Sequence, residues 1–90
     1  MQTTLEQEIR EFVLSTVIED MNHPLKPEEV TDDSPIGAGG IDLDSLSLIE
    51  LTMRLERRFG VEFPETDIEP LGAMKLGELV SDIIGRGATA

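Results

Sequence analysis

One serine lies where its hydroxyl could be used chemically. In "GGIDLDSLSLIELTMRLERRFG", Ser45 follows Asp44 and precedes Leu46, where apolar residues begin to recur at helical spacing. At the start of a helix, unpaired backbone N–H groups and the helix dipole favour an anion such as a phosphate. Ser45 is therefore a candidate attachment point for a phosphodiester, although a serine at this place is more often an N-cap.

Three side chains compete for the cap of this helix. Asp44 is as good a cap as Ser45 and would leave the Ser45 hydroxyl pointing outward. Ser47 with Glu50 also fits the Ser-x-x-Glu capping box, which would move the helix start by one turn. Local rules do not choose between these alternatives.

Three other kinds of chemistry do not fit the residues present. A serine nucleophile needs a base, and the only histidine is His23, in a proline-bordered loop. The "GAGG" at 37–40 has no preceding strand, as a phosphate-binding loop would require. The acids at 42 and 44 begin a calcium-loop spacing, but Leu46 and Met53 stand where ligands belong. We expect no enzymatic activity and no metal site.

The helix from about Ser45 to Phe59, stopped by Gly60, has two apolar stripes. Residues within about 80° of one another on the helix form the predicted core stripe: Leu48, Leu51, Leu55 and Phe59. A second stripe, centred about 130° away, comprises Leu46, Ile49 and Met53 and is continued by Arg57. This second stripe either packs against the preceding loop or the next short helix, or stays accessible as a docking surface.

Three further helices are predicted. The first runs from Thr4 to Met21, with apolar residues at helical spacing: Leu5, Ile9, Phe12, Val13, Val17 and Met21. A short helix is entered at Pro64 and closed by Pro70, and a last one spans about Lys75 to Ile84. One face of the last helix carries Leu76, Leu79, Val80, Ile83 and Ile84. The expected fold is all-α, a small four-helix bundle of three longer helices and one short helix.

The segment between the first two of these helices, 22–44, is rich in proline and glycine and is predicted to be a long ordered loop. Val30 and Ile36 are expected to pin it to the core, and Ser34-Pro35 to open one short helical turn.

Length and composition restrict the remaining possibilities. Ninety residues suit one domain over 1–90, with an ordered core of about 4–85 and a frayed tail at 86–90. The net charge of −12 argues against nucleic acid or membrane as partner and favours a basic protein surface. There is no cysteine, so any working thiol must be imported. No signal peptide or membrane span is evident, and a cytoplasmic monomer is expected.

At Asp44-Ser45-Leu46, followed by "IELTMRLERRFGVEFPETDIE", the chain resembles the acyl carrier proteins, including discrete carriers of polyketide pathways. The resemblance implies a serine at the start of the second helix that receives 4′-phosphopantetheine from coenzyme A, through a phosphopantetheinyl transferase and Mg²⁺. The thiol of that arm carries acyl groups as thioesters. By position the modified residue is Ser45 and not Ser47. Asp42 replaces a glycine common in the family, which affects the expected shape of the loop.

The resemblance also implies a set of partner contacts. The second helix serves as the recognition helix, with Leu46, Ile49 and Met53 as apolar contacts, Asp44 and Glu50 as acids that meet basic enzymes, and Arg57 continuing the strip. The implied partners are the transferase and acyl-loading or acyl-processing enzymes such as an acyltransferase, a ligase or a ketosynthase.

Arginines depart from the acidic pattern of familiar bacterial fatty-acid carriers. Arg54, Arg57 and Arg58 lie late in the second helix, which favours a dedicated pathway, polyketide or related secondary metabolism, over housekeeping lipid synthesis. Two alternatives stay open: a peptidyl carrier that holds an amino acid, and an acidic adaptor without the arm.

Overall fold

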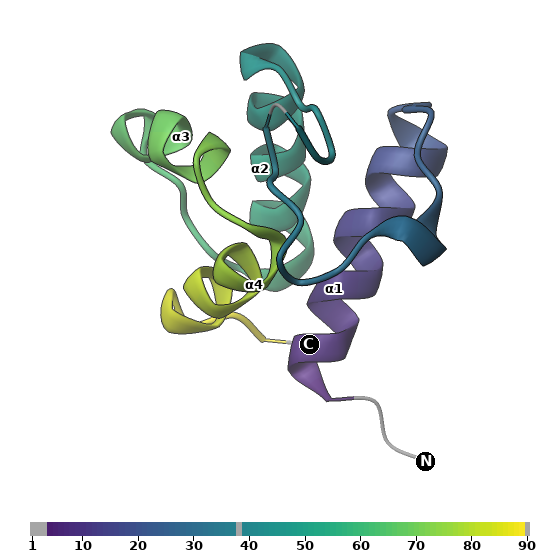
Figure 1. Cartoon of the computed structure of the whole chain (residues 1–90). Coiled ribbons are helices and arrows are strands. Elements are labelled where there is room, and N and C mark those ends of the chain that lie inside the picture. Colours follow the sequence, from purple (N-terminus) through teal and green to yellow (C-terminus); the bar gives the residue numbers. More distant parts are fainter. Residues whose placement is uncertain (1–3, 38, 90) are drawn as a thin grey trace.

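The computed structural model describes residues 4–37 and 39–89, and these form four α-helices and two short helical segments (Figure 1). In order, the elements are α1 (Leu5–Ser15), the π-helix η1 (Thr16–Asp20), the 3₁₀ turn η2 (Pro27–Glu29), α2 (Ser45–Phe59), α3 (Glu65–Gly72) and α4 (Leu76–Gly85). The all-α fold with three longer helices and one short helix is confirmed. Within these residues, no helix is long and apolar enough to cross a membrane.

The first helix begins directly after its N-cap, Thr4, and changes from α-helical to π-helical geometry before it ends. The side-chain oxygen of Thr4 accepts a hydrogen bond from the Gln7 backbone N–H at 3.1 Å. The helix then runs from α1 into the π-helical turn η1 and ends at Met21, so the predicted span from Thr4 to Met21 is one continuous helical segment. Its buried apolar residues belong to the common hydrophobic core: Ile9, Val13 and Val17.

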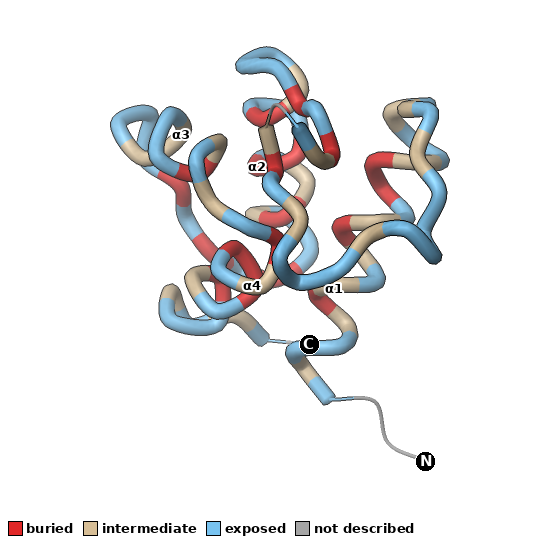
Figure 2. The backbone as a smooth tube through the Cα atoms, viewed as in Figure 1, coloured by how far each residue is buried: buried red, intermediate tan, exposed pale blue. Residues whose placement is uncertain are grey.

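The core lies between α2 and its neighbours. In Figure 2, buried residues recur along α2, whereas α3 is exposed or intermediate except at Leu71. All four residues of the predicted core stripe are buried: Leu48, Leu51, Leu55 and Phe59. The Phe59 ring meets the Phe12 ring of α1 edge to face, with centroids 5.4 Å apart. Gly60 ends α2 in the left-handed conformation, φ 69°, as predicted.

The long segment 22–44 is joined to α4 by backbone hydrogen bonds rather than by a helical turn. Ile36 is buried and Val30 half-buried, which confirms that both contact the core. The helical turn predicted at Ser34-Pro35 is wrong, because Pro35 forms an isolated antiparallel bridge with Lys75. The Leu76 N–H donates to Ser34 O at 2.9 Å, which keeps this stretch extended. The short helical turn in this segment is instead the 3₁₀ turn η2, at Pro27–Glu29.

The short helix α3 extends past its predicted end. We expected Pro70 to close it, but α3 continues to Gly72 with Pro70 inside it. The proline removes only one backbone donor, and the next residue, Leu71, is buried in the core and holds the following turn in place. A Cβ on Gly72 would lie 2.8 Å from Leu48 Cδ1, so the end of α3 approaches α2 closely.

The last helix, α4, begins one residue later than predicted, with Lys75 at the cap position and the Glu78 carboxylate accepting from the Lys75 N–H at 2.8 Å. Four of its predicted core residues are buried: Leu76, Leu79, Val80 and Ile83. Ile84, predicted on the same face, is 38% exposed and is not part of the buried core.

Arg86 follows α4 and ties it to the start of α3. Its guanidinium contacts Asp82 at 2.6 Å, Asp67 at 3.1 Å and the Glu62 carbonyl oxygen at 2.9 Å, and it lies 4.5 Å from the Phe63 ring centroid. These contacts occupy the first residue of the tail predicted to fray.

The rest of that tail also makes a backbone contact. The Thr89 N–H donates to Phe59 O at 3.0 Å, while Ala90 lies outside the described residues. The chain after α4 is thus held against the end of α2.

Replacing Arg86 with glutamine should lower the free energy of unfolding by about 1–2 kcal/mol, because charge-assisted hydrogen bonds to two carboxylates and a carbonyl are lost. Urea denaturation followed by circular dichroism measures this. Arg58→Gln is the matched control: it also removes a guanidinium next to a phenylalanine ring, at 4.8 Å from the Phe59 centroid, and it should lower the free energy of unfolding by less than Arg86→Gln does. Equal losses in the two variants would contradict the role assigned to Arg86.

Candidate functional site

Ser45 is the first residue of α2, and Asp44 is its N-cap. Asp44 has an extended backbone, and its Oδ1 accepts from the Ser47 backbone N–H at 2.8 Å. The cap is therefore Asp44, and neither Ser45 nor the alternative box of Ser47 with Glu50 is used. Ser45 itself is exposed.

The charge of Asp44 is fixed by the same contact. Hydrogen bonds from the Ser47 backbone N–H and then from its side chain hold the pKa of Asp44 below its ordinary value, and the charge of His23 lowers the pKa further. Asp44 stays negatively charged across the physiological range.

Two buried residues just before α2, Ile41 and Leu43, anchor the start of the helix. Ile41 and Leu43 are buried, and their N–H groups donate to Pro35 O at 2.8 Å and Ile36 O at 3.1 Å. This anchoring sets the point at which α2 begins and turns Asp44 and Ser45 outward.

Asp42 occupies the position where the acyl carrier family commonly has glycine, and its backbone explains that preference. It adopts the left-handed conformation, φ 63°, which aspartate tolerates better than most residues. Its Oδ1 accepts from the Gly39 N–H at 3.0 Å, which closes the turn before the helix. In this loop Ala38 lies outside the described residues.

The backbone at the start of α2 suits an anionic substituent on Ser45. The Leu48 N–H donates to Asp44 O at 2.9 Å and the Ser47 N–H is taken by the cap. The N–H groups of Ser45 and Leu46 precede the first N–H that donates within the helix and form part of the positive end of the helix dipole. An exposed hydroxyl beside these donors fits the attachment of a phosphodiester.

The second apolar stripe of α2 is exposed. The side chains of Leu46, Ile49 and Met53 are 76%, 43% and 53% exposed. We call these three residues the apolar strip. The alternative of full packing against the loop or the short helix is excluded, although part of the strip borders α3.

That border is an open groove between α2 and α3, which sequence reasoning missed. Its lining residues are Ile49, Thr52, Met53, Glu56, Phe63, Glu65 and Ile68. Glu56 Oε2 accepts from the Phe63 backbone N–H at 2.8 Å and fixes the far wall to α2. The groove depends on how two helices meet, so neither helix pattern alone could indicate it.

Charged residues flank the apolar strip at both ends. Asp44 lies at the Ser45 end, and Glu50 is exposed but contacts Arg54 at 3.3 Å. Arg57 lies exposed at the far end, beside Met53. Within residues 4–37 and 39–89, no group of three or more acidic, histidine or cysteine side chains is arranged to hold a metal ion.

Comparison with known proteins places the chain in a family. Residues 11–85 match the family described as "Phosphopantetheine attachment site". An acyl carrier protein of Campylobacter hominis is 37% identical over 68 residues, which cover 76% of this chain and 82% of the relative. One from Rhodococcus erythropolis is 32% identical over 83 residues, 92% of this chain and 85% of the relative.

A more specialised relative is also similar. The meromycolate extension acyl carrier protein of Mycolicibacterium aurum is 31% identical over 70 residues, 78% of this chain and 68% of the relative. Since the attachment-site match spans most of the helical bundle and these relatives are aligned over two thirds or more of both chains, the protein belongs to the acyl carrier protein family, whose covalent cofactor is 4′-phosphopantetheine.

Proposed function

We propose that Ser45 is the residue that carries 4′-phosphopantetheine and that the apolar strip beside it is the surface on which partner enzymes dock. The observation that supports this most is the cap: Asp44 satisfies the Ser47 N–H, so the Ser45 hydroxyl is exposed and free for modification. The bound arm supplies a thiol that holds acyl groups as thioesters.

The chain contributes a hydroxyl and its surroundings to the attachment step. Ser45 Oγ forms a bond to phosphorus of the coenzyme A pyrophosphate, the adjoining P–O bond breaks, and adenosine 3′,5′-bisphosphate leaves. The hydroxyl proton passes to a base on the transferase, since Asp44 is engaged in its cap. The chain is a substrate in this step, not its catalyst.

Charge near Ser45 favours a basic partner. Asp44 remains ionised, Glu50 is exposed on the next turns, and a phosphodiester on Ser45 adds a further negative charge. A transferase or acyl-handling enzyme with basic side chains here would be steered to the site and held in orientation. The apolar strip would provide the central contact between these charges.

We infer a dedicated pathway, polyketide or related secondary metabolism, rather than general lipid synthesis. The arginines near the end of α2 support the inference that this carrier has partner enzymes different from those of general lipid synthesis. One relative is named for a single product, meromycolate, so a carrier of this similarity can serve one pathway. A single carrier domain that acts as a monomer is sufficient for this role.

Intact mass tests the attachment site. After incubation with coenzyme A, Mg²⁺ and a broad-specificity phosphopantetheinyl transferase, the wild-type protein should gain one phosphopantetheine. Ser45→Ala should gain none, while Ser47→Ala, the matched control one half-turn away, should be modified as in wild type. Modification of Ser45→Ala, or its loss in Ser47→Ala, would show that the site is assigned to the wrong residue.

Two substitutions of Asp44 separate its role as the helix cap from the effect of its charge. Asparagine retains the cap acceptor without the charge, so at neutral pH Asp44→Asn should melt slightly below wild type, having lost only the charge-dependent part of the stabilisation, whereas Asp44→Ala should melt lower still. Both variants should be loaded more slowly by a basic transferase. Circular dichroism melts and initial loading rates measure the two effects, and an Asn variant as unstable as the Ala variant would refute the cap.

The lowered pKa of Asp44 predicts that the folding stability of the protein decreases at acidic pH. The pKa of Asp44 is lower in the folded than in the unfolded chain, so the unfolded chain binds the proton more tightly. The stabilisation is present above about pH 5 and is lost as pH falls through the ordinary value of 3.8 and then the lower folded value. Asp44→Asn should remove this component from the pH dependence of stability measured by urea denaturation.

Met53→Glu tests the apolar strip. The substitution should leave the far-UV spectrum and melting temperature unchanged, because the side chain is largely exposed, and should lower kcat/KM for loading by roughly fivefold or more. Ile84→Glu is the matched control, since Ile84 is an exposed apolar residue on α4. If Met53→Glu unfolds the protein, or if both variants load equally, the strip is not the docking surface.

A further inference from the structure

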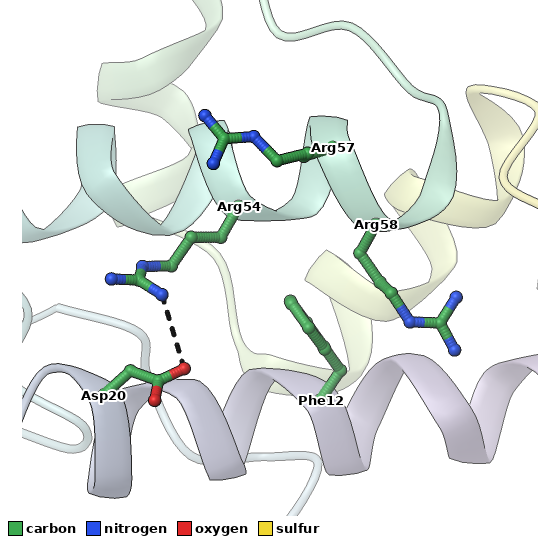
Figure 3. Close-up of a pocket in the computed structure, with 5 residues that line it drawn as sticks. All are labelled: Phe12, Asp20, Arg54, Arg57 and Arg58. Atoms are coloured by element: carbon green, nitrogen blue, oxygen red, sulfur yellow. Dashed lines mark hydrogen bonds and ion pairs between the residues drawn. The ribbon is translucent and has the colours of Figure 1, made fainter.

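An arginine cluster stands on the last turns of α2 in an otherwise strongly acidic chain. Arg54, Arg57 and Arg58 are three of the seven basic Lys and Arg residues, against 19 acids. Figure 3 shows that all three come from α2, opposite Phe12 of α1 and Asp20 of η1. We call Arg54, Arg57 and Arg58 the arginine cluster.

Within the described residues, only one member of the cluster is neutralised by the chain's own acids. Arg54 contacts Asp20 and Glu50, each at 3.3 Å. Arg58 lies 4.8 Å from the Phe59 ring centroid and Arg57 is exposed; neither makes an ion pair in the part of the chain that the structure describes. In Figure 3 the Arg57 guanidinium points away from α1.

The cluster is continuous with the apolar strip. Arg57 lines one hollow with Glu50, Met53 and Arg54. It also lines a second hollow with Phe12, Asp20, Arg54 and Arg58. Basic residues in the last turn complement the helix dipole, but that role needs no hollow and no exposed apolar neighbour. The position beside Met53 indicates contact with a partner.

We propose that the arginine cluster binds an acidic patch on the acyl-handling enzyme that docks on the apolar strip, with carboxylates pairing with Arg57 and Arg58. This inference rests on the proposed docking function of the strip. Arginine pairs with carboxylates in a two-pronged geometry that fixes orientation as well as affinity. Helical rise places Arg57 roughly 20 Å along α2 from Asp44.

The two ends of the face therefore carry opposite charge. The Ser45 end, with Asp44, fits basic side chains, and the far end fits acidic ones. A partner with this paired pattern can dock in one direction only, whereas a partner that is basic throughout meets repulsion at Arg57. A second copy of this chain is disfavoured as occupant, because each copy carries a net charge of −12.

The probe for this proposal is a pair of amphipathic helical peptides that share their leucines and differ in charge, one with glutamates and one with lysines. Titration into ¹⁵N-labelled protein at low salt should shift the amides of Met53, Arg57 and Arg58 with the glutamate peptide. The lysine peptide should instead shift residues around Asp44. Salt should weaken both interactions.

Arg57→Gln/Arg58→Gln should raise the Kd of the glutamate peptide by roughly tenfold. Lys26→Gln/Lys75→Gln removes two charges elsewhere and is the matched control, which should bind as wild type. Equal losses in both double variants, or no shift at the cluster, would overturn the proposal.

Two other occupants give distinct results that would also overturn it. Equal shifts with inorganic phosphate at matched ionic strength would mean general anion binding. Shifts at the cluster that grow with protein concentration alone would mean a second copy. Mass analysis of Ser45 loading in the wild-type protein keeps the two questions apart: absence of loading would refute the attachment site, whereas the peptide titrations, made on the unmodified protein, test the cluster alone.

Discussion

The hydrogen bond from the Ser47 N–H to Asp44 Oδ1 determines where α2 begins, and the exposure of Ser45 and of the apolar strip depends on that starting point. With Asp44 as cap, Ser45 is the first helical residue and its hydroxyl is exposed. The same register buries Leu48 and turns Leu46 outward. A start one turn later would leave Ser45 outside the helix and away from the positive end of its dipole.

A second constraint is the small size of the bundle. Helix α2 has apolar residues on two sides, and only one of these sides is buried, in a core shared with residues of α1, α4 and the segment before α2. Helix α3 is eight residues long and covers only the edge of the other side, so the apolar strip remains exposed beside an open groove. The exposed apolar strip and the groove beside it therefore follow from incomplete coverage of α2, and residues of opposite charge lie at the two ends of the strip.

Periodicity was enough to predict the helices and the core stripe and to identify the second stripe, because each depends on spacing within one segment, but it left open whether the second stripe is exposed. The cap was not predictable, since Asp44 and its rivals are equal locally and the buried Leu43 decides between them. The extended path at Pro35 depends on pairing with Lys75, far away in sequence. The end of α3 beyond Pro70 likewise depends on tertiary burial of the next residue.

The most direct test of the central claim is amide hydrogen exchange over residues 45–48, followed by NMR on the unmodified protein. The account predicts slow exchange at Ser47 and Leu48, whose N–H groups are bonded to Asp44, and fast exchange at Ser45 and Leu46. Fast exchange throughout residues 45–48, with protection beginning only one turn later, would mean that Asp44 does not cap α2 and would contradict the account.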